Sequence, residues 1–381
     1  MQGFELECTT KIYFGTGILE EAIRKSAEKL KGNILIIVTG NSVKKYGYLG
    51  NLVKYLKDIE TVKKVDIYDS ISSNPRLEDV MGAVKIGIDA QTDIVIGLGG
   101  GSAIDAAKAA AIGISQKADL GSMEEYLLNE KALEKEVLPI AAIPTTAGTG
   151  SELSKAAILS SEKYQIKSGI RGSRLQPQLA IVDSKLTWTL PEKITMETGF
   201  DVLAHAIESY VSVKSNFYTE MLSEKAVEIV GRCLRMLKKD LNNHDAREEM
   251  SYASMIMGLN LANAGTCLPH RMQYPIGAFA DTSHASGLAA LYPSWMQYEH
   301  EANREKIQHV MKLLKIQSSD NNIKKSFASF LDELGIQYRL GTFGIRQSDV
   351  NHLVSQVTGN LTNDKLYQSE NILFKIMKSS I

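Results

Sequence analysis

Four side chains in the second half of the sequence have the types and spacing of a metal site. Asp201 and His205 are four residues apart in a stretch with helical periodicity, which places a carboxylate and an imidazole on one helix face. His270 and His284 follow in a segment marked by proline and glycine. One carboxylate and three imidazoles suit Fe(II) or Zn(II). Each histidine alone would more often be an ordinary core or surface residue.

A glycine-rich loop at residues 97–108 (GLGGGSAIDAAK) has the features of a phosphate-binding turn. It follows a strand-like run and opens a helix of small residues, so bare glycine backbone and free N–H groups would meet a pyrophosphate. Ser102 would cap the helix or donate a hydrogen bond to a phosphate. The spacing GxGGGS is not the Rossmann fingerprint, and a purely structural turn is the alternative.

A second loop, residues 144–152 (PTTAGTGSE), also follows a strand-like run. Its hydroxyl groups and backbone amides suit ribose and phosphate recognition, and an ordinary Gly/Thr/Ser turn is the alternative. The candidate cofactor-binding residues of the two loops are Gly99, Gly100, Gly101, Ser102, Asp105, Thr145, Thr146 and Thr149.

The strand-like run at residues 34–39 ends in Gly40-Asn41-Ser42, which bears on the choice of cofactor. Folds that select NAD often carry an acid at such a strand end, where it binds the ribose 2′-OH and repels a 2′-phosphate. Here Gly40 leaves space, Asn41 and Ser42 offer donors, and Lys44 and Lys45 add positive charge. The pattern favours NADP(H), and a helix-start turn with solvated lysines is the alternative.

The elements that must position these residues fall into two halves. Apolar, β-branched runs predict buried parallel strands alternating with helices, at residues 33–39, 65–68, 93–98, 137–144 and 179–183. Helical periodicity prevails from residue 192 onward, with helices expected at residues 195–212, 220–238, 248–264 and 302–314. The sequence therefore predicts an α/β dinucleotide-binding domain at residues 1–187 and an all-α metal-binding domain at residues 188–381.

Composition sets limits on function. The 381 residues suit about two domains. Lys and Arg total 43 and Asp and Glu total 44, which gives no support for a nucleic-acid binder. No apolar run approaches the ~20 residues that span a bilayer, and the N-terminal residues lack the pattern of a signal peptide. The three cysteines read as reduced thiols, so a cytoplasmic protein is expected.

Taken together, the motifs resemble the iron-dependent (group III) alcohol dehydrogenase family, within the dehydroquinate synthase-like superfamily. The resemblance covers nearly the whole chain, with YFGTG, Asn74-Pro75, GLGGGSAIDAAKA, IPTTAGTGSE, LAIVD, GFDVLAHAIESYVS and the two-histidine segment in the same order. It implies reversible hydride transfer between NAD(P)H and a small-molecule alcohol/aldehyde pair, in a homodimer. It also implies an active site between the two domains, with a metal that binds the substrate oxygen as a Lewis acid.

The resemblance also assigns roles to residues. The family's metal ligands match Asp201, His205, His270 and His284. Its glycine loop matches residues 99–102, and its threonine pair matches Thr145 and Thr146. A cofactor-contacting asparagine matches Asn74, and a lysine near the nicotinamide ribose matches Lys167.

The sequence departs from the family at two positions. Many members carry an aspartate where Gly40 stands, and members with glycine tend to use NADP(H). Many also carry a histidine four residues after the ligand matching His270, on the proton path, where this chain has Tyr274. Tyr274 is the candidate catalytic substitute, and a packing residue is the alternative.

Arginines give one hint about the substrate. Arg271 directly follows a predicted ligand, and Arg171 and Arg174 follow Lys167. Cations around a metal site would suit a phosphonate- or carboxylate-bearing aldehyde, whereas the alternative is that they form surface or domain-bridging ion pairs. Three other functions stay open: a glycerol-type polyol dehydrogenase, a dehydroquinate-synthase-like cyclase, and a non-catalytic relative.

Overall fold

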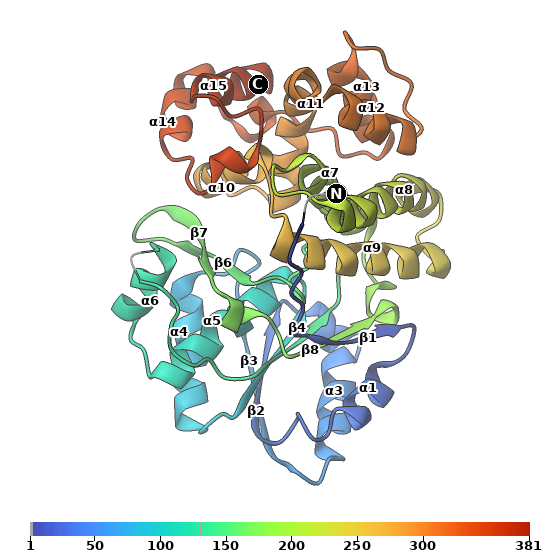
Figure 1. Cartoon of the computed structure of the whole chain (residues 1–381). Coiled ribbons are helices and arrows are strands. Elements are labelled where there is room, and N and C mark those ends of the chain that lie inside the picture. The colour runs from blue at the N-terminus through green and yellow to red at the C-terminus, as the bar shows by residue number, and fades with distance from the viewer. Residues whose placement is uncertain (1–2, 130) are drawn as a thin grey trace. The chain divides into compact units, whose positions relative to one another are not determined.

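Six parallel strands with helices on both faces make up most of residues 8–190, the first of two units into which the chain divides (Figure 1). The computed structural model describes residues 3–129 and 131–381. The strand order is β1-β8-β5-β4-β2-β3. The strands are β1 (Lys11–Gly15), β2 (Gly32–Thr39), β3 (Val62–Ile71), β4 (Ile94–Gly99), β5 (Ile140–Pro144) and β8 (Leu179–Asp183).

The central strands are apolar throughout because both faces of the sheet are covered. In β2, Leu35 and Ile37 join one core with helices α4 (Leu77–Asp89), α5 (Gly101–Gln116) and α6 (Leu120–Leu127). Ile34, Ile36 and Val38 alternate with them and join a second core with α1 (Leu19–Lys25) and α3 (Tyr48–Lys57). The unit also contains the short helix α2 (Ser42–Lys45) and an antiparallel pair, β6 (Ala156–Ser161) with β7 (Ile166–Arg171).

Helices form the second unit, which contains residues 191–381 and the described residues before Cys8. Its helices are α7 (Glu192–Val211), α8 (Phe217–Lys239), α9 (His244–Asn263), α10 (Leu268–Ala280), α11 (His284–Ala302), α12 (Arg304–Leu313), α13 (Ile323–Glu333), α14 (Val350–Ser355) and α15 (Asn371–Ser379). The predicted combination of an α/β part and an all-α part is therefore confirmed. Between residues 3–129 and 131–381, no helix is long and apolar enough to cross a membrane.

The division falls between residues 190 and 191, and it groups the N-terminal stretch with the helical unit. The border predicted from the sequence is after residue 187, with the N-terminal residues in the first domain. Two contacts hold this stretch. The Phe4 ring lies 6.5 Å from the Tyr218 ring, and the Glu7 N–H donates to the Asn263 side chain at 3.4 Å.

Candidate metal centre and cofactor-binding edge

Three helices of the second unit carry the four predicted metal ligands. Asp201 and His205 lie one turn apart in the middle of α7, which is buried along almost its whole length. His270 lies in the first turn of α10, and His284 is the first residue of α11. The Ser283 side chain caps α11 by accepting a hydrogen bond from the Ser286 N–H, which fixes where the helix begins.

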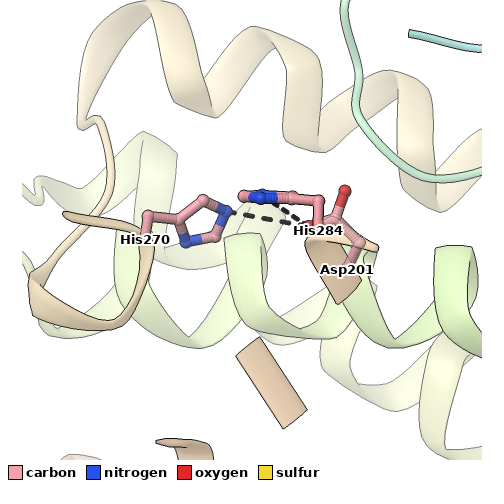
Figure 2. A group of neighbouring side chains, drawn as sticks. All are labelled: Asp201, His270 and His284. Atoms are coloured by element: carbon pink, nitrogen blue, oxygen red, sulfur yellow. Dashed lines mark ion pairs between the residues drawn. The ribbon is translucent and has the colours of Figure 1, made fainter. Parts of the chain in front are cut away.

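The three imidazoles converge on one carboxylate oxygen. The Nε2 atoms of His205, His270 and His284 lie 3.8, 3.7 and 3.6 Å from Asp201 Oδ1. Figure 2 shows the His270 and His284 rings directed toward the Asp201 carboxylate, with dashed lines for the two ion pairs. Two ligand atoms that are each ~2.1 Å from a tetrahedral cation lie about 3.4 Å apart, so these separations suit a single ion. The ligand atoms of Asp201, His270 and His284 all lie within 4.8 Å of one another, and His205 is placed next to them by its approach to Asp201 Oδ1.

The polar atoms at this centre are those that a cation would satisfy. Asp201 Oδ1 and His270 Nε2 are buried, and within residues 3–129 and 131–381 neither has a hydrogen-bond partner. Burial without a partner is costly for such groups. Burial alone would raise the pKa of the Asp201 carboxyl, but the surrounding imidazoles hold that pKa below its usual range. The donor set therefore fits a divalent ion.

A carboxylate outside the ligand set orients His270. Glu208 is fully buried on α7, and its Oε1 lies 2.7 Å from His270 Nδ1. Because a carboxylate accepts, Nδ1 donates and Nε2 keeps its lone pair for a metal. The other oxygen of Glu208 accepts from the Cys267 N–H at 2.7 Å. Burial would lower the pKa of His270, but the Glu208 and Asp201 charges raise it to about 10, so without a metal ion a proton would occupy the Nε2 position that faces Asp201.

The sequence analysis missed Glu208, although its spacing carried a signal. Glu208 is three residues after His205 and seven after Asp201, which puts it on the same face of α7. A second missed residue, Gln273, contacts His284 from α10, where it lies one turn after His270.

The predicted cofactor residues lie in the other unit, on loops that leave one edge of the sheet. Because the strands are parallel, Gly40 after β2, Gly99 at the end of β4 and Thr145 after β5 lie at the same edge. The chain runs from β2 outward to β3 and then returns to β4 on the other side of β2. Such a reversal is where open α/β sheets bind ligands at the carboxyl ends of their strands.

The glycine loop (residues 97–108) and the threonine loop (residues 144–152) pack closely against each other. The Thr145 N–H donates to the Gly99 carbonyl at 2.9 Å. A Cβ on Gly101 would lie 2.6 Å from Thr149 Cγ2, and one on Gly100 would lie 3.4 Å from Thr146 Oγ1. These contacts require small residues at the start of α5. They bring two of the predicted glycines against two of the predicted threonines.

The remaining candidates on this edge have defined partners. Gly100 caps α5, so the cap predicted for Ser102 is wrong, and Ser102 instead donates to the Ser73 carbonyl at 2.6 Å. Lys167 on β7 donates to the Asn74 side chain at 3.1 Å, which unites two predicted residues that are far apart in sequence. Asp105 is almost fully buried and accepts from the Ile158 N–H at 3.0 Å. Asp105 therefore lies inside the α/β unit, where it binds backbone of β6.

The end of β2 is open, as the sequence suggested. Gly40 has a φ of +64°, and nothing lies within 4 Å of the Cβ that a side chain would place there. Asn41 and Ser42 are exposed. Lys44 forms an ion pair with Asp69. Its positive charge is therefore already compensated, whereas the sequence predicted that it would be available for a 2′-phosphate.

Comparisons with known proteins match both units of the chain. Residues 9–184 match the family model for iron-containing alcohol dehydrogenase, and residues 195–380 match the model for the C-terminal part of the Fe-containing alcohol dehydrogenase family. Long-chain-alcohol dehydrogenase 1 of Geobacillus thermodenitrificans is 31% identical over 90% of this chain and 87% of its own. The chain belongs to the iron-containing alcohol dehydrogenase family.

Other relatives of this dehydrogenase bear on its fold, substrate and cofactor. An iron-containing alcohol dehydrogenase structure from Thermotoga maritima superposes with a TM-score of 0.87 at 31% identity, covering 99% of both chains. Sulfoacetaldehyde reductase of Bilophila wadsworthia is 27% identical over 89% of this chain and 88% of its own. Butanol dehydrogenases named for NADPH and for NADH are both relatives, from Clostridium saccharobutylicum and Clostridium acetobutylicum.

Membership makes this chain an enzyme that interconverts alcohols and aldehydes with NAD(P)H and iron. A divalent ion supplies a Lewis acid for the substrate oxygen, and the nicotinamide supplies or accepts the hydride. The chain's own residues hold and orient these groups.

The three arginines of the substrate prediction have different surroundings. Arg174 forms an exposed ion pair with Glu136, and Arg171 donates to the Gly169 carbonyl at 2.7 Å. Arg271 is half-buried, and its Cζ lies 6.0 Å from the Tyr274 ring centroid. The Tyr274 ring in turn stacks against the His284 ring, with the centroids 6.2 Å apart. Tyr274 therefore borders the metal centre, and Arg271 lies behind it, next to the Tyr274 ring.

Proposed function

We propose that this dehydrogenase reduces an aldehyde that carries an anionic group, using iron and NADPH. The observation that carries the proposal is Arg271. It follows His270 directly, its Nε is buried, and across the described residues that nitrogen has no hydrogen-bond partner. Among residues 3–129 and 131–381, no carboxylate forms an ion pair with Arg271. A buried N–H without an acceptor is costly, and an anionic substrate group would supply a bidentate partner for the guanidinium.

The name of one relative supports this substrate class. Sulfoacetaldehyde is a two-carbon aldehyde with a sulfonate, so its reductase acts on an aldehyde with a fixed negative charge. A sulfonate, a phosphonate and a carboxylate all present oxygens in the geometry that a guanidinium binds.

The Arg271→Met variant tests the substrate class. It keeps the apolar stem and removes the charge, so kcat/KM for sulfoacetaldehyde should fall by about 10²-fold, the equivalent of a charged hydrogen bond. The value for neutral butanal should change by less than about threefold. Arg271→Lys should recover part of the loss, and Arg174→Met is the control. Equal losses for both aldehydes would contradict the proposal.

The open space at the end of β2 is the basis for proposing a preference for NADPH. No acid occupies the Gly40 position to repel a 2′-phosphate, and Asn41 and Ser42 are exposed beside it. We expect the wild type to have the lower KM for NADPH. Gly40→Asp should reduce the NADPH-to-NADH ratio of kcat/KM by at least about tenfold, because like charges repel.

Gly40→Asn is the matched control for that variant. Asparagine and aspartate both tolerate a left-handed backbone, so the two variants differ mainly in charge. Gly40→Asn should retain the preference for NADPH. A wild type that prefers NADH, or two variants that behave alike, would overturn the cofactor proposal.

Tyr274 is proposed to donate the proton that the carbonyl oxygen gains on reduction. Its ring lies against the ligand His284, and its side chain is only partly buried. Tyr274→Phe should lower kcat by about 10²-fold, a typical contribution of a general acid, without loss of metal. Tyr274→His should retain much of the rate because imidazole can also donate. A Tyr274→Phe enzyme with the kcat of the wild type would contradict this role and would show that Tyr274 is a packing residue.

A further inference from the structure

We infer that Gln273 is a positioning residue that holds the ligand His284 in its metal-binding form. The inference rests on the four-residue metal site and is independent of the substrate class. Gln273 is fully buried on α10, and its Oε1 lies 2.5 Å from His284 Nδ1. Gln273 thus contacts the Nδ1 atom of His284 in the same way that Glu208 contacts the Nδ1 atom of His270.

The direction of this hydrogen bond decides which nitrogen of His284 is available. An amide oxygen can only accept, so Nδ1 carries the proton and Nε2 keeps its lone pair. That Nε2 is the atom that lies 3.6 Å from Asp201 Oδ1. A partner on the far nitrogen of a ligating histidine fixes both its tautomer and its ring orientation.

Two glycines confine the Gln273 side chain. A Cβ on Gly277, one turn later in α10, would lie 2.8 Å from Gln273 Nε2. A Cβ on Gly287, in the first turn of α11, would lie 3.0 Å from Gln273 Cγ. Larger residues at either position would push the amide off His284. The site is therefore built around this glutamine from two helices.

The neutrality of Gln273 also matters for charge. Asp201 and Glu208 already place two carboxylates at the buried centre, which balances the charge of one divalent ion. A third carboxylate would leave an excess of negative charge in a low-dielectric site. An amide supplies the hydrogen bond to His284 without adding that charge.

Metal retention tests this role without reference to catalysis. The protein is loaded with Co(II), and the loss of its visible absorption is followed after addition of a chelator. Gln273→Leu has a similar size but no acceptor, and it should release the metal about 10–100-fold faster than the wild type. Gln273→Glu keeps the acceptor and should release the metal no faster than the wild type. Gln176→Leu, which removes a buried glutamine from the α/β unit, should leave the rate unchanged.

If Gln273→Leu fails to fold, Gly287→Ala supplies the second test, because its methyl group displaces Gln273 and should also speed metal release. Release from Gln273→Leu at the wild-type rate, or equal acceleration in Gln273→Glu and Gln273→Leu, would overturn the inference. Failure of the substrate proposal would leave Co(II) retention untouched, so the two results are distinguishable.

Discussion

His270→Ala is expected to yield a folded protein that retains almost no iron and reduces aldehydes at least about 10³-fold more slowly. The variant removes one of three imidazoles that face Asp201 Oδ1. It also leaves Glu208 buried without the donor that His270 supplies. A Lewis acid contributes several kcal/mol to such a reaction, and each 1.36 kcal/mol is a factor of about ten in rate.

Metal analysis and a nicotinamide absorbance assay on the same preparation measure both effects. His352→Ala is the matched control, because that histidine is exposed on α14. It should keep full metal content and activity. A His270→Ala enzyme that is active without metal would refute the ligand assignment.

Lys108→Met is expected to destabilise the α/β unit by about 3–5 kcal/mol, the usual cost of removing one partner from a buried ionic network. Lys108 is fully buried on α5, and its ammonium donates to the Ser154 carbonyl, the Ser154 hydroxyl and the Ala156 carbonyl at 2.8–3.0 Å. Burial lowers the pKa of Lys108 to about 8, against the attraction of Asp105 3.8 Å away, so the amine is still mainly charged at pH 7.

This network lies next to the loop at residues 144–152, which is predicted to bind the cofactor. Asp105 and Lys108 tie α5 to the start of β6, and the threonine loop runs between β5 and β6. Removing Lys108 takes a donor from two carbonyls and a hydroxyl, and it takes the neighbouring positive charge from Asp105, which keeps only its hydrogen bonds. The melting temperature of the unit should fall by about 10 °C, since 1 kcal/mol corresponds to about 2–4 °C at this size.

Thermal unfolding followed by circular dichroism, with and without NADPH, measures the effect. Lys85→Met, on the exposed side of α4, should change the unfolding free energy by less than about 0.5 kcal/mol. A Lys108→Met protein with the same melting temperature as the wild type would show that the three hydrogen bonds add no net stability.

Much of the fold could be predicted because periodicity and burial agree. The apolar runs of β2 and β4 are buried on both faces, and the 3.6-residue spacing of α7 puts two ligands on one face. Parallel strands then bring the loops after β2, β4 and β5 to one edge without further information.

Other elements carried a weak or misleading pattern. Pro275 lies inside α10, so the segment that contains His270 and His284 looked interrupted. The short edge strand β1 has no buried residue, β6 alternates between buried and half-buried residues, and β7 is half-buried over its first three residues, so all three lack the continuous buried apolar run of the central strands.

The supporting polar residues could not be found from local sequence. Glu208 and His270 are 62 residues apart, and Lys108 and Ser154 are 46 apart. Along the chain, each is one more polar residue on a helix, and only tertiary packing reveals its partner. Likewise, nothing local distinguishes Arg271 from Arg174, although only the latter has an ion-pair partner among the described residues.

X-ray absorption at the iron edge of anaerobically purified protein tests the metal centre most directly. One iron per chain is predicted, with a first shell of nitrogen and oxygen at about 2.0–2.2 Å and outer scattering from three imidazoles. A first shell that contains sulfur, or one that lacks imidazole scattering, would contradict the assignment of Asp201, His205, His270 and His284 as the iron ligands.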